Sequence, residues 1–184
     1  MINKTHPWFA LTVKPRHEKN VARMLQNKQL EPFLPLYRAR QRWTDRIKTV
    51  DLPLFPGYLF CRFDFTHRLP VLQTPGVTSL VGFAQAPTPV SDAEIAGIQA
   101  ILASGLPAQP WPYVRAGQWV RIEQGALAGL EGTLIREKDS LRVVVSVELL
   151  RRAVAVEIDR EMICAVQGAA HASVAHLYLT KTAS

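Results

Sequence analysis

Residues 117–132, with the sequence GQWVRIEQGALAGLEG, decide the fold class of the C-terminal half of this chain. Val120 and Ile122 alternate with their neighbours at the two-residue period of a half-buried strand. Three glycines then interrupt the run before a second alternating segment, 133–136: Gly125, Gly129 and Gly132. Because glycine accepts positive φ angles, this spacing indicates a strand, a sharp turn and a second strand. Such corners are typical of a small β-barrel, and an ordinary hairpin is the alternative.

Several short strands are expected in this half, with no helical pattern between them. They lie at residues 118–123, 132–137, 141–147 and 153–158. Before them, residues 104–112 (SGLPAQPWP) hold three prolines and no periodicity, which predicts a linker. We therefore expect a small β-barrel over residues 113–166 and a disordered tail over residues 167–184.

The first half mixes strand and helix patterns and is expected to form its own domain over residues 1–103. Apolar runs predict strands at residues 8–13, 52–63 and 77–83, and alternation at 37–50 predicts a hairpin. A helical pattern covers residues 17–29, and Ser91 with Glu94 forms a capping box that begins another helix. The predicted fold class is α+β, with a linker leading to the barrel.

The positive charge of the chain is concentrated in this first half. The net charge is +7; residues 1–103 carry 13 Lys and Arg against 7 Asp and Glu, and residues 104–184 carry 9 against 8. This distribution predicts that a polyanion meets the N-terminal domain, with a general solubility bias as the alternative.

Cysteine usage and hydropathy indicate the compartment. Cys61 and Cys164 lie far apart in apolar runs, which predicts reduced core thiols and neither a disulfide nor a metal site. The N-terminal residues have no apolar core segment, and no run approaches the ~18 apolar residues of a membrane span. We therefore expect a soluble, cytoplasmic protein with no membrane partner, no metal ion and no cofactor.

Five short motifs follow one another along nearly the whole chain. They are Trp8-Phe9, residues 54–60 (LFPGYLF), Pro75-Gly76-Val77, Pro89-Val90-Ser91 and residues 117–132. Their order and spacing resemble the NusG family of transcription elongation and antitermination factors. The resemblance implies an NGN domain, which is an antiparallel sheet flanked by helices, linked to a C-terminal KOW β-barrel. Residues 53–64 (PLFPGYLFCRFD) are more similar to specialised paralogues such as RfaH, UpxY and LoaP than to housekeeping NusG.

The resemblance implies a polymerase-binding surface in the first half. Tyr58 and Phe60 lie two apart on a predicted strand, so their rings share one face. In family members the matching positions, together with those of Phe83 and Ile95, form an apolar patch that binds the clamp helices of the largest RNA polymerase subunit. Rigid aromatic side chains suit such a groove, and an ordinary core is the alternative.

A second polymerase contact is implied at His67 and Arg68. These residues stand where RfaH carries a His-Thr-Thr motif that touches polymerase on the opposite side of its DNA cleft. Only the histidine matches, and a solvated loop histidine is the alternative.

Two basic groups are candidates for nucleic-acid binding. Four residues cluster at the first strand–helix junction, where they are expected to meet the non-template DNA strand of the transcription bubble: Lys14, Arg16, His17 and Arg23. Met24 and Pro75 replace further DNA-contacting residues of RfaH, so the RfaH sequence element is not expected to be read. A solvated helix face is the alternative.

The second basic group lies on the predicted hairpin and consists of Arg38, Arg40, Arg42, Arg46 and Lys48. Arg38, Arg40 and Arg42 alternate along one strand and therefore share a face. Upstream DNA or a polymerase surface is the predicted partner, and a charged edge that prevents aggregation is the alternative.

In the C-terminal half, Leu149, Leu150 and Arg151 lie between two predicted strands. In NusG the matching loop carries an apolar residue that contacts Rho or the ribosomal protein NusE. Leu150 takes that place, and Arg151 replaces the usual glycine. Apolar residues in an exposed turn predict a docking site. The residues VVVSV at 143–147 favour a strand, so the helical hairpin that RfaH adopts in this half is not expected.

No catalytic pattern is present in the sequence. The glycines lack the Lys-Ser/Thr ending of a phosphate-binding loop, and the histidines have no ligand spacing. We expect a monomeric, non-enzymatic factor that suppresses pausing or termination and recruits a second partner. A ribosome-associated, RNA-binding KOW protein is the alternative, but it would carry its basic surface on the barrel.

Overall fold

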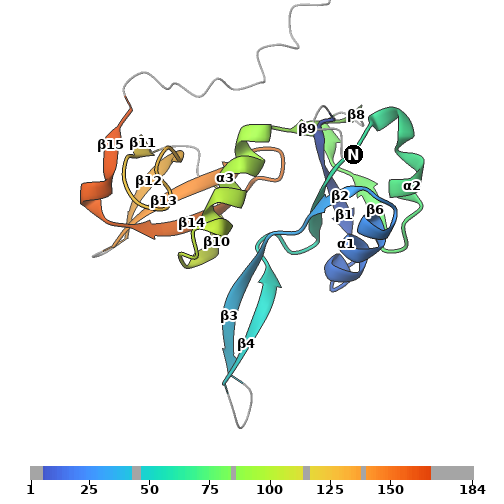
Figure 1. The fold of residues 1–184 in the computed structure, drawn as a ribbon, viewed down its shortest axis with the longest axis horizontal. Helices are drawn as coiled ribbons and strands as arrows, with labels where there is room; N and C mark the ends of the chain where they lie inside the picture. The colour runs from blue at the N-terminus through green and yellow to red at the C-terminus, as the bar shows by residue number, and fades with distance from the viewer. Residues whose placement is uncertain (1–5, 43–46, 84–85, 114–116, 138–139, 167–184) are drawn as a thin grey trace, which may run out of the picture.

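The computed structural model describes residues 6–42, 47–83, 86–113, 117–137 and 140–166. These residues form two lobes, and a helix, α3 (Asp92–Ala103), lies between them (Figure 1). The N-terminal lobe contains β1 (Trp8–Val13), α1 (Glu18–Asn27), β2 (Glu31–Phe33), β3 (Leu36–Arg42), β4 (Ile47–Pro53), β5 (Tyr58–Arg62), the short 3₁₀ helix η1 (Phe65–His67), α2 (Leu69–Leu72), β6 (Val77–Leu80), β7 (Gly82–Phe83), β8 (Ala86–Pro87) and β9 (Pro89–Val90). The C-terminal lobe contains β10 (Ala108–Pro112), β11 (Gln118–Ile122), β12 (Glu131–Glu137), β13 (Ser140–Val147), β14 (Arg152–Ile158), the 3₁₀ helix η2 (Arg160–Met162) and β15 (Ile163–Ala165). The predicted tail, residues 167–184, lies outside the described residues.

The N-terminal lobe is built on an antiparallel sheet with β1 at its centre. Its order is β2-β5-β1-β6, and β9 also pairs with β1. Successive side chains of β1 point to opposite faces, and both faces are buried. Phe9 and Leu11 pack against Val21 and Leu25 of the amphipathic helix α1. The sheet and helices confirm the predicted α+β class for this half.

The apolar run predicted as one strand over residues 52–63 is two strands. β4 ends at Pro53 and β5 begins at Tyr58, with a tight turn between them. Gly57 has a φ of 82° there, and its N–H donates to the Glu18 carboxylate at 3.0 Å. Leu54 and Phe55 are buried although they lie in the turn, which is why hydropathy did not mark the break.

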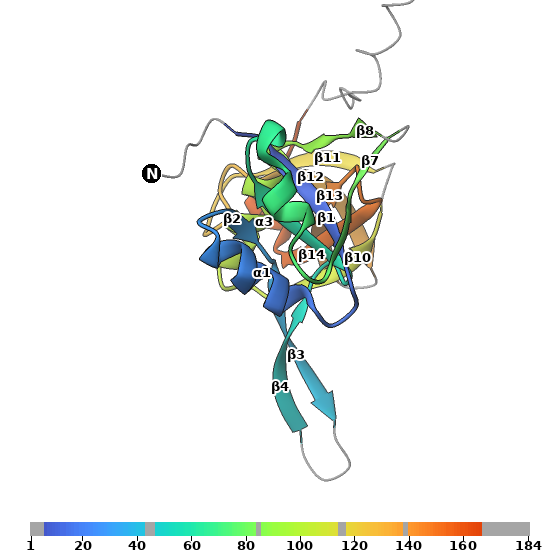
Figure 2. The same cartoon turned by 90° about the vertical axis from the view of Figure 1, so that its right-hand side faces the viewer.

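Strands β3 and β4 form the predicted hairpin. They pair from Leu36 opposite Pro53 to Arg42 opposite Ile47, and the hairpin projects away from both lobes (Figures 1 and 2). The connecting residues 43–46, where the turn is predicted, lie outside the described residues.

The C-terminal lobe is an antiparallel sheet in the order β10-β14-β13-β12-β11-β15. The strands predicted at 118–123, 132–137, 141–147 and 153–158 are confirmed to within one residue at every end. Part of the segment predicted as a linker differs, because Ala108–Pro112 forms β10 and pairs with β14. Its prolines are tolerated because β10 is an edge strand in the described sheet and leaves one side unpaired.

The two cysteines have different environments. Cys61 on β5 is buried, as predicted, whereas Cys164 on the edge strand β15 is exposed, so its prediction as a core residue is wrong. Among the described residues, no helix is long and apolar enough to cross a membrane.

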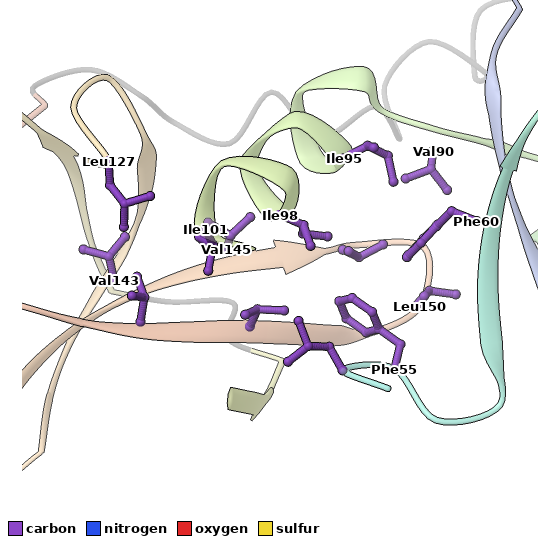
Figure 3. Close-up of a cluster of buried hydrophobic side chains, with 14 of the residues drawn as sticks. Phe55, Phe60, Val90, Ile95, Ile98, Ile101, Leu127, Val143, Val145 and Leu150 are labelled. Atoms are coloured by element: carbon purple, nitrogen blue, oxygen red, sulfur yellow. The ribbon is translucent and has the colours of Figure 1, made fainter. Parts of the chain in front are cut away.

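One hydrophobic cluster continues from one lobe into the other. Phe60 and Val90 of the N-terminal sheet meet Ile95 and Ile98 of α3, and these meet Val145 of the C-terminal sheet (Figure 3). Ser91 caps α3 by accepting the Ala93 N–H at 3.2 Å. Residues far apart in the sequence therefore share one core.

Candidate functional site

The residues predicted to bind polymerase come together on one face of the N-terminal sheet. Tyr58 and Phe60 share the face that carries Trp8, while Leu59 and Cys61 of the same strand belong to the opposite cluster. Phe60 lies against two further rings, with centroid separations of 6.1 Å to Phe33 and 5.6 Å to Phe55. Ile95 joins this cluster from α3. Phe83 lies on β7, and its side chain is outside the described part of the structure.

The C-terminal lobe covers this aromatic patch. Phe60 is fully buried and Ile95 is 1% exposed, whereas Tyr58 is half-buried with the Arg152 guanidinium 5.5 Å from its ring centroid. Leu150 packs in the same cluster from the C-terminal side (Figure 3). In this arrangement Phe60 and Ile95 are therefore inaccessible to another protein.

The turn at residues 148–151 contributes to that cover. The sequence predicts an exposed Leu150, but the side chain is only 7% exposed because the turn folds onto the N-terminal lobe. Leu149 is half-buried, and Arg151 is exposed with its guanidinium 5.1 Å from the Tyr113 ring centroid. Arg151 has a φ of 51°, in the left-handed region that favours glycine, which gives a physical reason for a glycine at this position in family members.

Polar contacts hold α3 to both lobes. The Glu94 carboxylate accepts the backbone N–H of Glu148 at 3.0 Å, and burial raises the pKa of Glu94. At the start of the helix, Asp92 accepts from Arg62 at 3.1 Å. The Arg62 guanidinium also lies 4.6 Å from the Trp8 ring centroid.

The basic residues at the strand–helix junction are exposed: Lys14, Arg16, His17 and Arg23. Arg16 has a φ of 66°, and His17 Nδ1 lies 3.0 Å from the Pro15 carbonyl oxygen. Arg23 donates to the Asn20 side chain at 3.2 Å. The group is thus accessible to a polyanion.

On the hairpin, Arg38 and Arg40 are exposed and share one face of β3. They stand opposite Asp51 and Thr49 of β4. Lys48 is exposed and pairs with Gln41, which places it on the other face. Arg42 lies at the end of β3, and its side chain, like the whole of Arg46, is outside the described structure.

His67 and Arg68 lie on the far side of the N-terminal lobe from α3, at the start of α2 (Figure 1). His67 Nδ1 lies 3.0 Å from the Asp64 carboxylate. Hydrogen bonds from Thr66, first by its side chain and then by its backbone, lower the pKa of Asp64 to about 2, with His67 adding to the effect. Next to them Leu69 is 63% exposed, an accessible apolar residue that is not among the predicted site residues. The sequence feature that could have indicated Leu69 is an apolar residue next to Pro70, in a short segment that proline interrupts.

Comparison with known proteins identifies the family of this chain. A protein-family model described as "Transcription termination factor nusG" matches residues 6–99, which is just over half of the chain. The chain belongs to the NusG family. The Thermus thermophilus transcription termination/antitermination protein NusG is 30% identical over 175 residues, covering 83% of this chain and 94% of that protein. The Lactococcus lactis NusG is 29% identical over 175 residues, covering 87% of this chain and 93% of that protein.

A solved NusG structure has the same fold. The structure described as "Domain interaction in Thermotoga maritima NusG" is 18% identical, with a TM-score of 0.53 and coverage of 89% of this chain and 98% of that chain. Family membership makes this chain a transcription termination/antitermination factor, and proteins of this family are not enzymes. Among the described residues, no group of three or more His, Cys, Asp or Glu side chains is arranged to hold a metal ion.

Proposed function

We propose that this NusG-family protein is an elongation and antitermination factor that binds the clamp helices of the largest RNA polymerase subunit. The proposed binding surface is the aromatic patch of Tyr58 and Phe60, with Phe83 and Ile95 at its margin. The observation that carries the proposal is that rigid aromatic side chains gather on one sheet face and are covered by another part of the same chain. An apolar face that the C-terminal lobe covers is also suited to bind an apolar helical partner in place of that lobe.

Polymerase binding then requires the C-terminal lobe to move away. Leu150 and its neighbours occupy the space in which clamp helices would lie. The same movement would expose Leu150 and more of Leu149 beside the already exposed Arg151, and we propose these three residues as the docking site of a KOW domain for NusE or Rho. Polymerase and the second partner would therefore be engaged together.

The basic surfaces complete the proposed complex. Lys14, Arg16, His17 and Arg23 would bind phosphates of the non-template strand, and the hairpin arginines would bind upstream DNA or polymerase. His67 and Arg68, with the exposed Leu69, would contact polymerase across its DNA cleft. Together these contacts would bridge the cleft and suppress pausing or termination.

The test measures binding of the full chain to a clamp-helix fragment of polymerase. Tyr58→Ala is the main variant, because Tyr58 is half-buried and its loss costs the fold less than that of Phe60. Leu150→Asp is the second variant, because a carboxylate in the interlobe cluster favours separation of the lobes. We expect Tyr58→Ala to weaken binding about tenfold or more and Leu150→Asp to strengthen it.

Trp111→Ala is the matched control. Trp111 packs on the opposite face of the C-terminal sheet, beside Ile135 and Ala155. Its replacement by alanine therefore removes a comparable aromatic contact at a place away from the patch. Clamp-helix binding that is unchanged in folded Tyr58→Ala and in Leu150→Asp would contradict the proposal.

A further inference from the structure

A cavity of about 530 Å³ lies between α3 and the C-terminal sheet. Glu94, Ala96 and Gly97 line it from α3, and Tyr113 and Trp119 line it from the other side. Glu148, at the start of the 148–151 turn, lines it, whereas the other lining residues belong neither to the aromatic patch nor to the basic surfaces discussed above. Its size is that of a small-molecule site, for which volumes run from about 300 to 1,000 Å³.

The charged groups that line the cavity are all acidic. They are Glu94, Glu131 and Glu148, and no Lys, Arg or His is among the described lining residues. Glu131 is already compensated, since it accepts hydrogen bonds from Arg121 and from the Trp119 indole N–H. Within the described part of the chain, Glu94 and Glu148 have no arginine partner of this kind; the Glu94 carboxylate accepts the backbone N–H of Glu148 at 3.0 Å, which places the two residues side by side.

The raised pKa of Glu94 reflects its position in this acidic part of the cavity. Burial is the largest cause of its rise, and repulsion from Glu148 adds to it. The surroundings of Glu94 therefore disfavour its ionised form. A positive group placed between the Glu94 and Glu148 carboxylates would offset that effect.

The remaining lining suits an organic cation better than a hydrated ion. Tyr113 and Trp119 present aromatic rings, and the Tyr113 ring already lies 5.1 Å from the Arg151 guanidinium. Ser146 also lines the cavity, and its Oγ is buried without a hydrogen-bond partner in the described structure. A buried hydroxyl without a partner is costly unless a ligand or water supplies one.

We propose that this cavity binds a small organic cation, a guanidinium or ammonium group on a short apolar chain. The cationic group lies between Glu94 and Glu148, and the chain lies along Ala96 and Gly97 toward the aromatic rings. Because the ligand contacts both α3 and the C-terminal sheet, it stabilises the closed arrangement of the lobes. If the proposed polymerase function holds, the same ligand opposes polymerase binding.

The direct test uses the full chain and two probes of the same shape, n-butylguanidinium and neutral n-butylurea, at constant ionic strength. Isothermal titration calorimetry is expected to give saturable butylguanidinium binding with a Kd of about 1 mM or tighter. Butylurea is expected to bind at least about tenfold more weakly. Absence of saturation, or equal binding of the two probes, would overturn the proposal.

Variants separate the site from general attraction of cations. The double variant Glu94→Gln, Glu148→Gln should weaken butylguanidinium binding at least about tenfold, while Glu123→Gln, an exposed carboxylate outside the lining, should not. Ala96→Phe should block binding by filling the cavity, and it is safe for the fold because Ala96 is exposed on α3. If the double variant does not fold, Ala96→Phe alone tests whether the cavity binds the cation. Retained binding in folded Ala96→Phe would count against the site.

The coupling to polymerase is a separate measurement. Saturating butylguanidinium should lower clamp-helix binding by the full chain, and Ala96→Phe should remove that effect. Because the calorimetric test contains no polymerase, its failure refutes the cation site alone. Cation binding without any effect on clamp-helix binding would leave the site in place and refute the coupling.

Discussion

Gln29, the second residue after α1 ends at Asn27, has a backbone conformation that suits glycine better. Its φ is 60°, and its N–H donates to the Gln26 carbonyl at 2.9 Å while the Leu30 N–H donates to the Leu25 carbonyl at 3.2 Å. These are the two hydrogen bonds of a Schellman motif, in which the left-handed position is usually glycine. We expect Gln29→Gly to raise the free energy of unfolding by about 0.5–1 kcal/mol, measured by urea denaturation.

Gln29→Ala is the control for that prediction. Alanine keeps the Cβ that is unfavourable at positive φ, so its variant should gain nothing over the parent protein. Equal stability of the Gly and Ala variants would show that the backbone at this residue carries no strain.

The two cysteines should differ sharply in reactivity. Burial, with a smaller contribution from Glu31, raises the pKa of the Cys61 thiol to about 12, whereas Cys164 is exposed. Since the thiolate is the reactive form, one thiol in each native chain should react quickly with an aromatic disulfide reagent at about pH 8. The second should react only after unfolding, and Cys164→Ser should abolish the fast phase. A fast phase that persists in Cys164→Ser would contradict the burial of Cys61.

At the scale of elements, the hairpin of β3 and β4 offers a prediction about nucleic acid. Arg38 and Arg40 are exposed on one face, and Arg38→Gln with Arg40→Gln should weaken single-stranded DNA binding. If both contact phosphates, the slope of log K against log salt should fall by about 1.4. Fluorescence anisotropy over a salt series measures both quantities.

The matched control is Arg136→Gln with Arg160→Gln, which removes two exposed arginines of the C-terminal lobe. Because the net charge changes equally, general electrostatics would weaken both double variants alike. Equal losses would show that the hairpin has no specific part in DNA binding.

Elements were predictable from the sequence where one local signal decided them. The two-residue alternation at 37–50 and the capping box at Ser91 gave a hairpin and a helix that the structure contains. Local sequence patterns failed where buried residues lie outside a strand, and where a strand contains residues that are typical of loops. Leu54 and Phe55 are buried in a turn and so looked like strand, and Pro110 and Pro112 lie on an edge strand and so looked like linker.

At the scale of the whole molecule, accessibility was the property that the sequence did not reveal. Periodicity placed Tyr58 and Phe60 on one face correctly, but it contains no information on what packs against that face. The covering lobe is about 90 residues later in the chain, at Leu150. Phe60 and Leu150 are buried in one cluster that continues from one lobe into the other. A site shared between lobes is therefore found only when both lobes are placed.

The contact between the lobes should depend on pH through Glu94. Its pKa is raised by burial, so the closed structure favours the protonated carboxyl. A raised folded-state pKa means that this stabilisation is complete below the unfolded value of about 4.5 and is lost as pH rises through the folded value. Glu94→Gln keeps an acceptor for the Glu148 N–H and a capping-box side chain but removes the charge.

We therefore expect Glu94→Gln to be more stable than the parent protein at about pH 7 and equal to it at about pH 4. Urea denaturation across this range measures the difference, and the distance between fluorophores on the two lobes reports whether they separate. Glu123→Gln, an exposed carboxylate of the same lobe as Glu148, should follow the parent at every pH. A Glu94→Gln variant that is less stable at neutral pH would mean that the ionised carboxylate holds the lobes together. Opening would then be favoured by acid instead of by base.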